Sequence, residues 1–272
     1  MSDPRLFGIV NLTEDSFSDG GRYLDPGAAI AHARALARAG AAVIDLGAAA
    51  SNVMAKPVDP AEEIRRLEPV IAALAGDGIA VSVDSFRSEV QRFAIARGVA
   101  FLNDIQGFPD AAVYPELAAA KCRLVVMHAV QQGGRAQQVA LSADAIWHRI
   151  QEFFAARLAA LGRAGIARER LILDPGMGFF LSSRPEASLR VLAGLGRLKR
   201  AFGLPVLVSV SRKSFLRALT GRAAGELGAA TLAAELHAAA GADFIRTHDP
   251  GALADGLRVM RALRTAAAEL GE

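Results

Sequence analysis

The sequence predicts one α/β barrel of eight parallel strands, and two observations predict it. Eight short apolar runs each stop at a polar or charged residue, and the stretches between them carry apolar residues at helical spacing. Parallel strands covered on both faces need continuous Val, Ile and Leu, whereas their carboxyl ends open onto the loops that hold substrate. Eight strand–helix units in 272 residues favour a single (β/α)8 TIM barrel over an open doubly wound sheet.

The elements follow in order along the chain. The predicted strands are residues 6–10, 43–46, 80–83, 101–102, 124–127, 171–173, 206–210 and 244–245. The residues at which the runs stop are Asn11, Asp45, Asp84, Asn103, His128, Asp174, Arg212 with Lys213, and Arg246 with His248. Helices fill the intervals; in residues 61–74, for example, Ile64, Leu67 and Val70 share one face. No Pro-, Gly- or Ser-rich linker suggests a second domain, so we expect one domain over residues 1–272.

Composition favours a well-cored cytoplasmic enzyme. Hydrophobic residues make up 52% of the chain, enough for one large core. The single cysteine, Cys122, leaves no partner for an intrachain disulfide, and its place before an apolar run favours a structural thiol over a nucleophile. The first predicted strand begins by Leu6, which leaves no room for a secretory leader, and charges interrupt every long apolar stretch, so we expect no membrane association.

The charge distribution argues against a nucleic-acid partner. The 31 basic and 28 acidic residues give a net charge of only +3, and the arginines are scattered through predicted helices near acidic residues. Four candidate cations instead gather at the ends of the seventh and eighth strands, where barrels commonly bind phosphate: Arg212, Lys213, Arg246 and His248. We therefore expect a small-molecule substrate with an anionic group.

Blocks at seven strand ends resemble those of the dihydropteroate synthase family. They read NLTEDSFSDGG at 11–21, VSVDSF at 81–86, LNDIQGF at 102–108, VVMH at 125–128, LILDPGMGF at 171–179, SRKSF at 211–215 and IRTHD at 245–249. Their order and spacing match over nearly the whole chain. The resemblance implies condensation of 6-hydroxymethyl-7,8-dihydropterin pyrophosphate with p-aminobenzoate, which gives 7,8-dihydropteroate and pyrophosphate in folate synthesis.

The residues at these ends suit a pterin. Its aminopyrimidine edge presents donors beside acceptors, which carboxylates and an amide of fixed direction can recognise. Asp84, Asn103 and Asp174 supply such groups at the ends of strands three, four and six, although each could also be a buried structural residue. The resemblance assigns them to pterin, and places Lys213 between pterin and aminobenzoate. The other substrate contacts that it implies are Met127, Gly178, Phe179, Ser211, Arg246 and His248.

The departure of pyrophosphate leaves negative charge that nearby cations must stabilise. Arg246 and His248, two residues apart on an extended segment, point to one side and can hold phosphate oxygens. The resemblance adds Mg²⁺, with Asn11 as its protein ligand, and such an ion keeps most of its waters. No second His or Cys stands at ligand spacing from His128, which argues against zinc. We expect a dissociative substitution without a covalent enzyme intermediate, with Asp84, Lys213, Arg246 and His248 as the catalytic residues.

The second loop departs from the family. It reads DLGAAASNVMAKP at 45–57, where most relatives carry Glu-Ser-Thr-Arg-Pro, so Ser51 can supply the hydroxyl but no Arg is present. Together with GMGFFL after Asp174, this resembles the sulfonamide-insensitive branch of the family. A ring that admits a flat carboxylate but clashes with a tetrahedral sulfonyl group would discriminate against the drug. Phe179 is the candidate and Phe180 the second, with an ordinary core phenylalanine as the alternative.

Two other functions remain open at this stage. A pterin-dependent methyltransferase that passes a methyl group to a corrinoid resembles this chain in barrel and pterin slot, but it needs neither the pyrophosphate cations nor SRKSF. A non-catalytic pterin-binding paralogue would explain the missing Arg of the second loop. The resemblance also implies a homodimer formed through the later helices.

Overall fold

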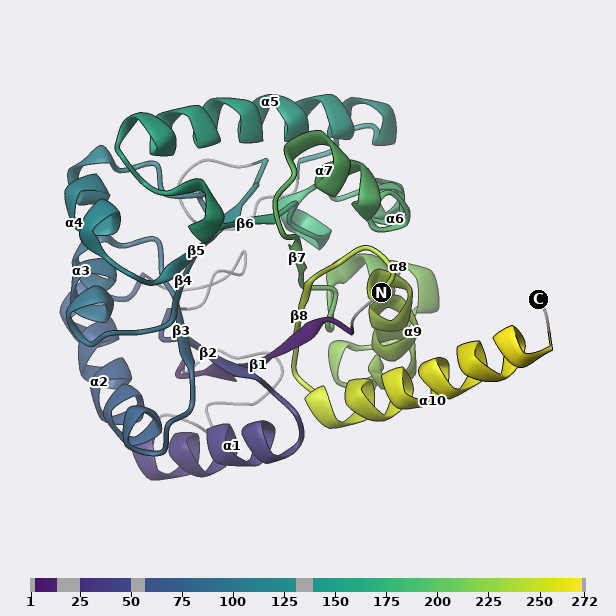
Figure 1. Ribbon diagram of the computed structural model, residues 1–272, viewed down its shortest axis with the longest axis horizontal. Helices are drawn as coiled ribbons and strands as arrows, with labels where there is room; N and C mark the ends of the chain where they lie inside the picture. Colours follow the sequence, from purple (N-terminus) through teal and green to yellow (C-terminus); the bar gives the residue numbers. More distant parts are fainter. Residues whose placement is uncertain (1–2, 14–24, 50–56, 131–138, 271–272) are drawn as a thin grey trace.

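The computed structural model describes residues 3–13, 25–49, 57–130 and 139–270. Eight strands in these ranges form one sheet that curves into a barrel, and helices surround it (Figure 1). The strands are β1 Arg5–Asn11, β2 Val43–Gly47, β3 Val81–Asp84, β4 Phe101–Asp104, β5 Arg123–Met127, β6 Leu171–Asp174, β7 Leu207–Val208 and β8 Phe244–Thr247. The (β/α)8 fold predicted from the sequence is confirmed.

All neighbouring strands pair in parallel, in the order β6-β5-β4-β3-β2-β1-β8-β7. An isolated parallel bridge between Leu173 and Val206 closes the ring between β6 and β7. Strand β7 is shorter than the predicted 206–210, because only Leu207 and Val208 pair with β8 and Val206 makes only the isolated bridge. A turn follows at residues 211–212. Lys213 N donates to Val210 O across 3.2 Å, and Arg212 has a left-handed backbone with φ of 58°.

Helices follow the strands and cover the outside of the barrel. They are α1 Pro26–Arg38, α2 Pro60–Gly76, α3 Ser88–Ala96, α4 Tyr114–Ala119, α5 Ala143–Arg163, α6 Pro185–Ala193, α7 Leu195–Phe202, α8 Ser214–Thr220, α9 Gly228–Ala238 and α10 Pro250–Glu269. Short 3-10 turns are η1 Ala111–Val113, η2 Arg168–Arg170, η3 Gly178–Phe180 and η4 Ala224–Glu226. Helix α2 shows how the local sequence sets a helix. The Asp59 side chain caps its amino end, Pro60 is its first residue, and its apolar face is buried against the strands. Only α10 projects away from the barrel (Figure 1).

The barrel interior is apolar at one end and polar at the other. Near the amino ends of the strands, the rings of Phe7, Phe101 and Phe244 meet edge to face with centroids 5.0 to 6.2 Å apart. Val43, Val125, Ile172 and Leu207 complete this layer. Because strand side chains alternate with a period of two, the next inward residues toward the carboxyl ends include Asp45 after Val43 and Arg246 after Phe244. Asp45 and Arg246 therefore lie within β2 and β8, whereas the sequence pattern placed them at strand ends.

Candidate active site

Two aspartates and one arginine form the centre of the polar end. Arg246 Nη2 donates to Asp84 Oδ2 across 2.8 Å, and Arg246 Nε donates to Asp45 Oδ2. The Asp45 side chain is fully buried, whereas the Asp84 side chain is 19% exposed at the barrel mouth. Asp45 is thus the inner partner that holds the arginine, and Asp84 is the carboxylate that a ligand can reach. The sequence pattern singled out Asp45 as a residue at which a strand ends but did not include it in the site.

Burial shifts the protonation of this group. Burial raises the pKa of Asp84 to about 7, although the charge of Arg246 opposes the shift. Burial and the charge of Arg246 lower the pKa of Lys213 to about 8. Burial by itself would lower the pKa of Arg246, but the charges of Asp45 and Asp84 raise it, so the guanidinium stays charged. Near neutral pH, Asp84 and Lys213 can therefore gain or lose a proton at little cost, which is typical of catalytic sites.

Asp174 and Asn103 lie beside this group with unused hydrogen-bonding capacity. Asp174 Oδ1 accepts from Gly176 N across 2.8 Å, and burial raises the pKa of Asp174 to about 6. Asn103 is 4% exposed, and its Oδ1 bonds to no described residue. Ser209 Oγ and Asp45 Oδ1 are equally unpartnered among these residues. Buried polar atoms are normally satisfied, so a group of unsatisfied ones in a barrel mouth favours a polar ligand there.

Two glycines let the loop after β6 approach its neighbours: Gly176 lies against the end of β5, and Gly178 lies against the turn after β7. Gly176 and Gly178 have left-handed φ values of 74° and 65°. A Cβ at Gly178 would lie 2.8 Å from Ser214 Oγ, and one at Gly176 would collide with His128 O. This close approach seats Lys213 with its Nζ 5.3 Å from the ring centroid of Phe180.

Ser211 and His248 join the ends of the seventh and eighth strand segments. Ser211 Oγ lies 2.8 Å from His248 Nδ1, and His248 N donates to the same hydroxyl across 3.3 Å. Burial, with the charges of Arg212 and Arg246, lowers the pKa of His248 well below its usual value. The imidazole is therefore neutral at pH 7, whereas the sequence analysis grouped His248 with the cations.

Apolar side chains form one wall beside Lys213. Met127, Ile105 and Phe180 are buried together, and the half-buried Phe179 packs against them. His128 lies behind this wall: its Nδ1 is 3.0 Å from Pro175 O, and burial lowers its pKa to about 4. Cys122 is buried on the other side of β5, and burial raises its pKa, as expected for a structural thiol.

Asn11 ends β1 at the same mouth. Its Oδ1 is 3.7 Å from the position that a Cβ on Gly47 would occupy, and that position is 3.9 Å from Asp84 Cβ. Within the described residues, no three His, Cys, Asp or Glu side chains gather as a metal site. The single amide oxygen of Asn11 would suit a hydrated Mg²⁺, which takes few protein ligands at phosphate sites.

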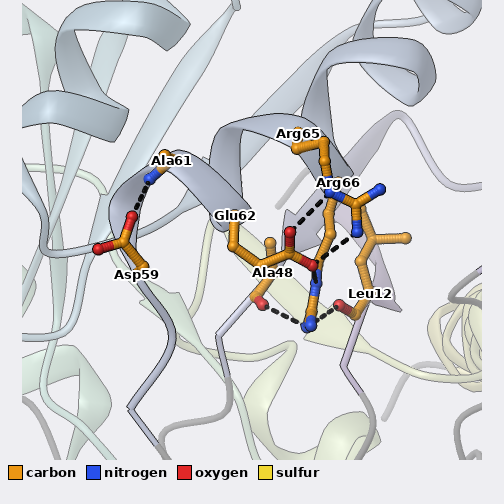
Figure 2. Close-up of polar contacts among 7 residues, drawn as sticks. All are labelled: Leu12, Ala48, Asp59, Ala61, Glu62, Arg65 and Arg66. Carbon is orange, nitrogen blue, oxygen red and sulfur yellow. Dashed lines mark hydrogen bonds and ion pairs between the residues drawn. The ribbon is translucent and has the colours of Figure 1, made fainter.

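Arg66 of α2 holds the starts of the first and second loops. Its Nη1 donates to Leu12 O across 3.2 Å and to Ala48 O across 3.4 Å, and its Nε donates to Glu62 Oε1 across 2.7 Å (Figure 2). Leu12 directly follows β1 and Ala48 directly follows β2. One buried guanidinium therefore fixes both loop stems. No sequence pattern indicated this contact; Ser51, further along the second loop, lies outside the described residues.

The chain is similar to known proteins over nearly its whole length. Residues 7–248 match the family described as pterin binding enzyme. The chain is 62% identical to the dihydropteroate synthase type-2 of Escherichia coli over 263 residues, which are 96% of this chain and 97% of that protein. It belongs to the dihydropteroate synthases. It is therefore a transferase of folate biosynthesis.

Solved structures agree with this membership. The dihydropteroate synthase of Yersinia pestis in a sulfonamide drug complex superposes with a TM-score of 0.90 at 31% identity, covering 97% of this chain and 95% of that one. That of Xanthomonas albilineans with 4-aminobenzoic acid superposes with a TM-score of 0.86 at 37% identity, covering 97% and 94%. In the described part of this enzyme, no helix is long and apolar enough to cross a membrane.

Proposed function

We propose that the polar mouth of the barrel is the site at which this enzyme joins 6-hydroxymethyl-7,8-dihydropterin pyrophosphate to p-aminobenzoate. The observation that carries the proposal is the buried cluster of Asp84, Arg246 and Lys213, with the unpartnered Asn103 Oδ1 in the same interior. The cluster offers both hydrogen-bond acceptors and positive charge within one barrel. A pterin pyrophosphate needs both.

The pterin occupies the inner part of this mouth. Asp84 and Asp174 accept hydrogen bonds from the amino and ring N–H groups, and Asn103 Oδ1 accepts another. Lys213 donates to the pterin carbonyl or ring nitrogen from the opposite side. Met127 and Gly178 pack against the ring, since Met127 lines the apolar wall and Gly178 lies directly beside Lys213. Missing hydrogen bonds would leave buried groups unsatisfied, so other rings bind poorly.

The pyrophosphate lies toward the outer rim. Arg246 uses Nε and Nη2 for the aspartates, so Nη1 is the nitrogen that remains for a phosphate oxygen. The Ser211 hydroxyl accepts from His248 N and directs its own proton to His248 Nδ1, so the ring proton sits on Nε2 and can be donated to phosphate. Asn11 Oδ1 would hold Mg²⁺, which when bound neutralises charge on the leaving group.

The chemical step is a dissociative substitution. The bond from the pterin methylene carbon to the pyrophosphate oxygen breaks, and its electron pair leaves with pyrophosphate. The aminobenzoate nitrogen then forms the new bond to that carbon and releases one proton to solvent. Asp84 stabilises the developing cation, and Lys213, Arg246 and His248 stabilise the departing anion. The reactants are held in place by the barrel, which supplies much of the acceleration.

Aminobenzoate lies between the pterin and the half-buried Phe179. The Xanthomonas relative was solved with 4-aminobenzoic acid and the Yersinia relative with a sulfonamide, so both molecules bind members of this family. Phe179 flanks the slot and narrows it against a tetrahedral sulfonyl substituent, with Phe180 as the second candidate. Ser211, and Ser51 of the second loop, would meet the benzoate carboxylate. We therefore propose that sulfonamides inhibit this enzyme weakly.

Pyrophosphate release tests the function. Purified enzyme is given dihydropterin pyrophosphate, p-aminobenzoate and Mg²⁺, and a sulfonamide is then titrated in. Release that depends on aminobenzoate and persists at high drug supports both proposals. Release lost at low drug removes the insensitivity, while pterin binding without release would indicate a non-catalytic paralogue. Methyl transfer to a corrinoid would indicate the third candidate.

We propose in addition that the chain is a single cytoplasmic domain that forms a homodimer. Support for association comes from α10, which projects from the barrel and exposes Val259, Met260 and Leu263. Analytical ultracentrifugation across a tenfold concentration range tests it. A sedimentation coefficient of the monomer throughout would contradict the dimer.

A further inference from the structure

A second cavity lies at the opposite mouth of the barrel. It has a volume of about 640 Å³ and is lined by residues at the amino ends of strands, among them Arg5 of β1, Arg123 of β5 and Phe244 of β8. Lys199 and Arg200 of α7 complete one side. The candidate active site opens at the carboxyl ends of the same strands. The layer of Phe7, Phe101 and Phe244 separates the two.

The cavity holds more positive than negative charge. Its lining contains four cations, which are Arg5, Arg123, Lys199 and Arg200, and two acids, which are Asp3 and Asp243. Both acids are already engaged. Asp243 Oδ1 accepts from Lys199 Nζ across 2.6 Å and its Oδ2 accepts from Val206 N across 2.9 Å, while Asp3 pairs with Arg261 of α10.

Three arginines of the cavity make no direct ion pair with a described residue. Within the described residues, Arg5, Arg123 and Arg200 form no ion pair. Arg5 and Arg123 instead lie over the face of Phe244, with their Cζ atoms 5.9 and 5.1 Å from the ring centroid. Burial and the neighbouring charge of Arg5 lower the pKa of Arg123, with only partial relief from Asp243. Two guanidinium groups are thus held close together against mutual repulsion.

We propose that this cavity binds a small multivalent oxyanion, either a phosphate or a polycarboxylate. Guanidinium groups offer paired donors in a plane that matches both kinds of oxyanion, and the aromatic floor holds Arg5 and Arg123 in place before the ligand arrives. An anion between them would replace their repulsion by two attractions. The volume suits a small ligand, since such sites usually enclose about 300 to 1,000 Å³.

Calorimetric titration of the full chain with inorganic phosphate, and separately with citrate, tests the proposal. Both the wild type and Arg258→Met, which removes an exposed arginine of α10, should bind with the same affinity. Arg123→Met and Arg200→Met should each weaken binding by about tenfold or more through loss of charge-assisted hydrogen bonds. The active site is unchanged in all four proteins, so any binding there cancels in the comparison.

The outcomes separate the ligand sources. If the protein binds phosphate but not citrate, the cavity is a phosphate site; if it binds citrate but not phosphate, the cavity is a carboxylate site. Binding of both anions supports a site for multivalent oxyanions in general. The proposal would be overturned if Arg123→Met and Arg200→Met both bound the two anions with the affinity of the wild type. Because Arg200 is exposed on α7, its variant tests the site even if loss of Arg123 disturbs the barrel.

Discussion

Arg246 Nη2 donates to Asp84 Oδ2 across 2.8 Å although the residues are 162 positions apart, and the same guanidinium is held from below by the fully buried Asp45. The pair sets the charge at the centre of the mouth. Asp84 can face a ligand while Asp45 cannot, so the two carboxylates are expected to differ in function. Removing each carboxylate in turn therefore separates contact with the substrate from structural support of Arg246.

Asp84→Asn should reduce kcat/KM by about 100-fold or more, because it removes the charge that stabilises the developing cation. Asp45→Asn is the matched variant: it should chiefly lower the free energy of unfolding, by roughly 3 kcal/mol, because it removes one partner of a buried ion pair. Steady-state kinetics and urea denaturation measure the two effects. Equal kinetic losses in both variants would contradict the division of roles.

Arg66→Met should loosen the stems of the first two loops and raise KM or lower kcat by about tenfold, since misplaced loops cost orientation. Arg65→Met is the control, because Arg65 bonds the same Glu62 but neither Leu12 nor Ala48 (Figure 2). The kinetic constants of the two variants are compared at equal fractions folded. Identical behaviour of both would show that the loop contacts do not matter for activity.

Gly178→Ala should cost about 2 to 3 kcal/mol of stability and reduce activity, because a methyl group would press on Ser214 and shift the neighbouring Lys213. Gly203→Ala isolates the backbone contribution: Gly203 has a similar φ of 62°, but nothing lies within 4 Å of its added Cβ. It should cost about 1 kcal/mol and leave kcat/KM unchanged. Thermal unfolding and kinetics measure both, and an inactive Gly203→Ala would speak against the clash.

Phe179→Gly should increase sulfonamide inhibition by about tenfold while the KM for p-aminobenzoate changes less, since the ring is proposed to exclude the larger group. Phe180→Leu provides the comparison for the second candidate. Inhibition constants are measured against aminobenzoate as competitor. An unchanged inhibition constant in a working Phe179→Gly enzyme would remove Phe179 as the discriminator.

Glu235→Gln should stabilise the protein at pH 8.5 more than at pH 5. Burial in α9 raises the pKa of Glu235 to about 8, although a hydrogen bond from Thr247 of β8 opposes the shift. A raised carboxyl pKa gives stability that is present below the unfolded value of about 4.5 and lost as pH rises through about 8. The neutral Gln avoids that loss, on the order of 2 kcal/mol.

Urea denaturation from pH 5 to 8.5 measures this difference. The exposed Glu186→Gln on α6 is the matched control for the loss of one carboxylate. A gain that is the same at every pH would mean that Glu235 is ionised in the folded protein throughout this range.

Much of the arrangement of the site follows from the alternation of side chains along each strand, which can be seen in the sequence. In a parallel barrel, residues two apart on one strand share the interior, so the pattern Phe244, Arg246, His248 already places a ring below a cation and an imidazole. The same rule brought Asp84, Asn103 and Asp174 to one mouth. The pattern overextended β7, because Val206 and Val210 are apolar and buried like the strand residues although only Leu207 and Val208 pair with β8.

By itself, the sequence determined the fold, the strand ends that meet at the active mouth, and the family. Only the tertiary structure decided which charges are paired. Closure of the barrel brings Asp45 and Asp84 to Arg246, brings Arg66 to Leu12 and Ala48, and places Arg5 and Arg123 over Phe244 without a direct ion pair to any described residue. These contacts join residues on different strands and helices, and their distances depend on how the strands are staggered around the ring, which no local pattern specifies.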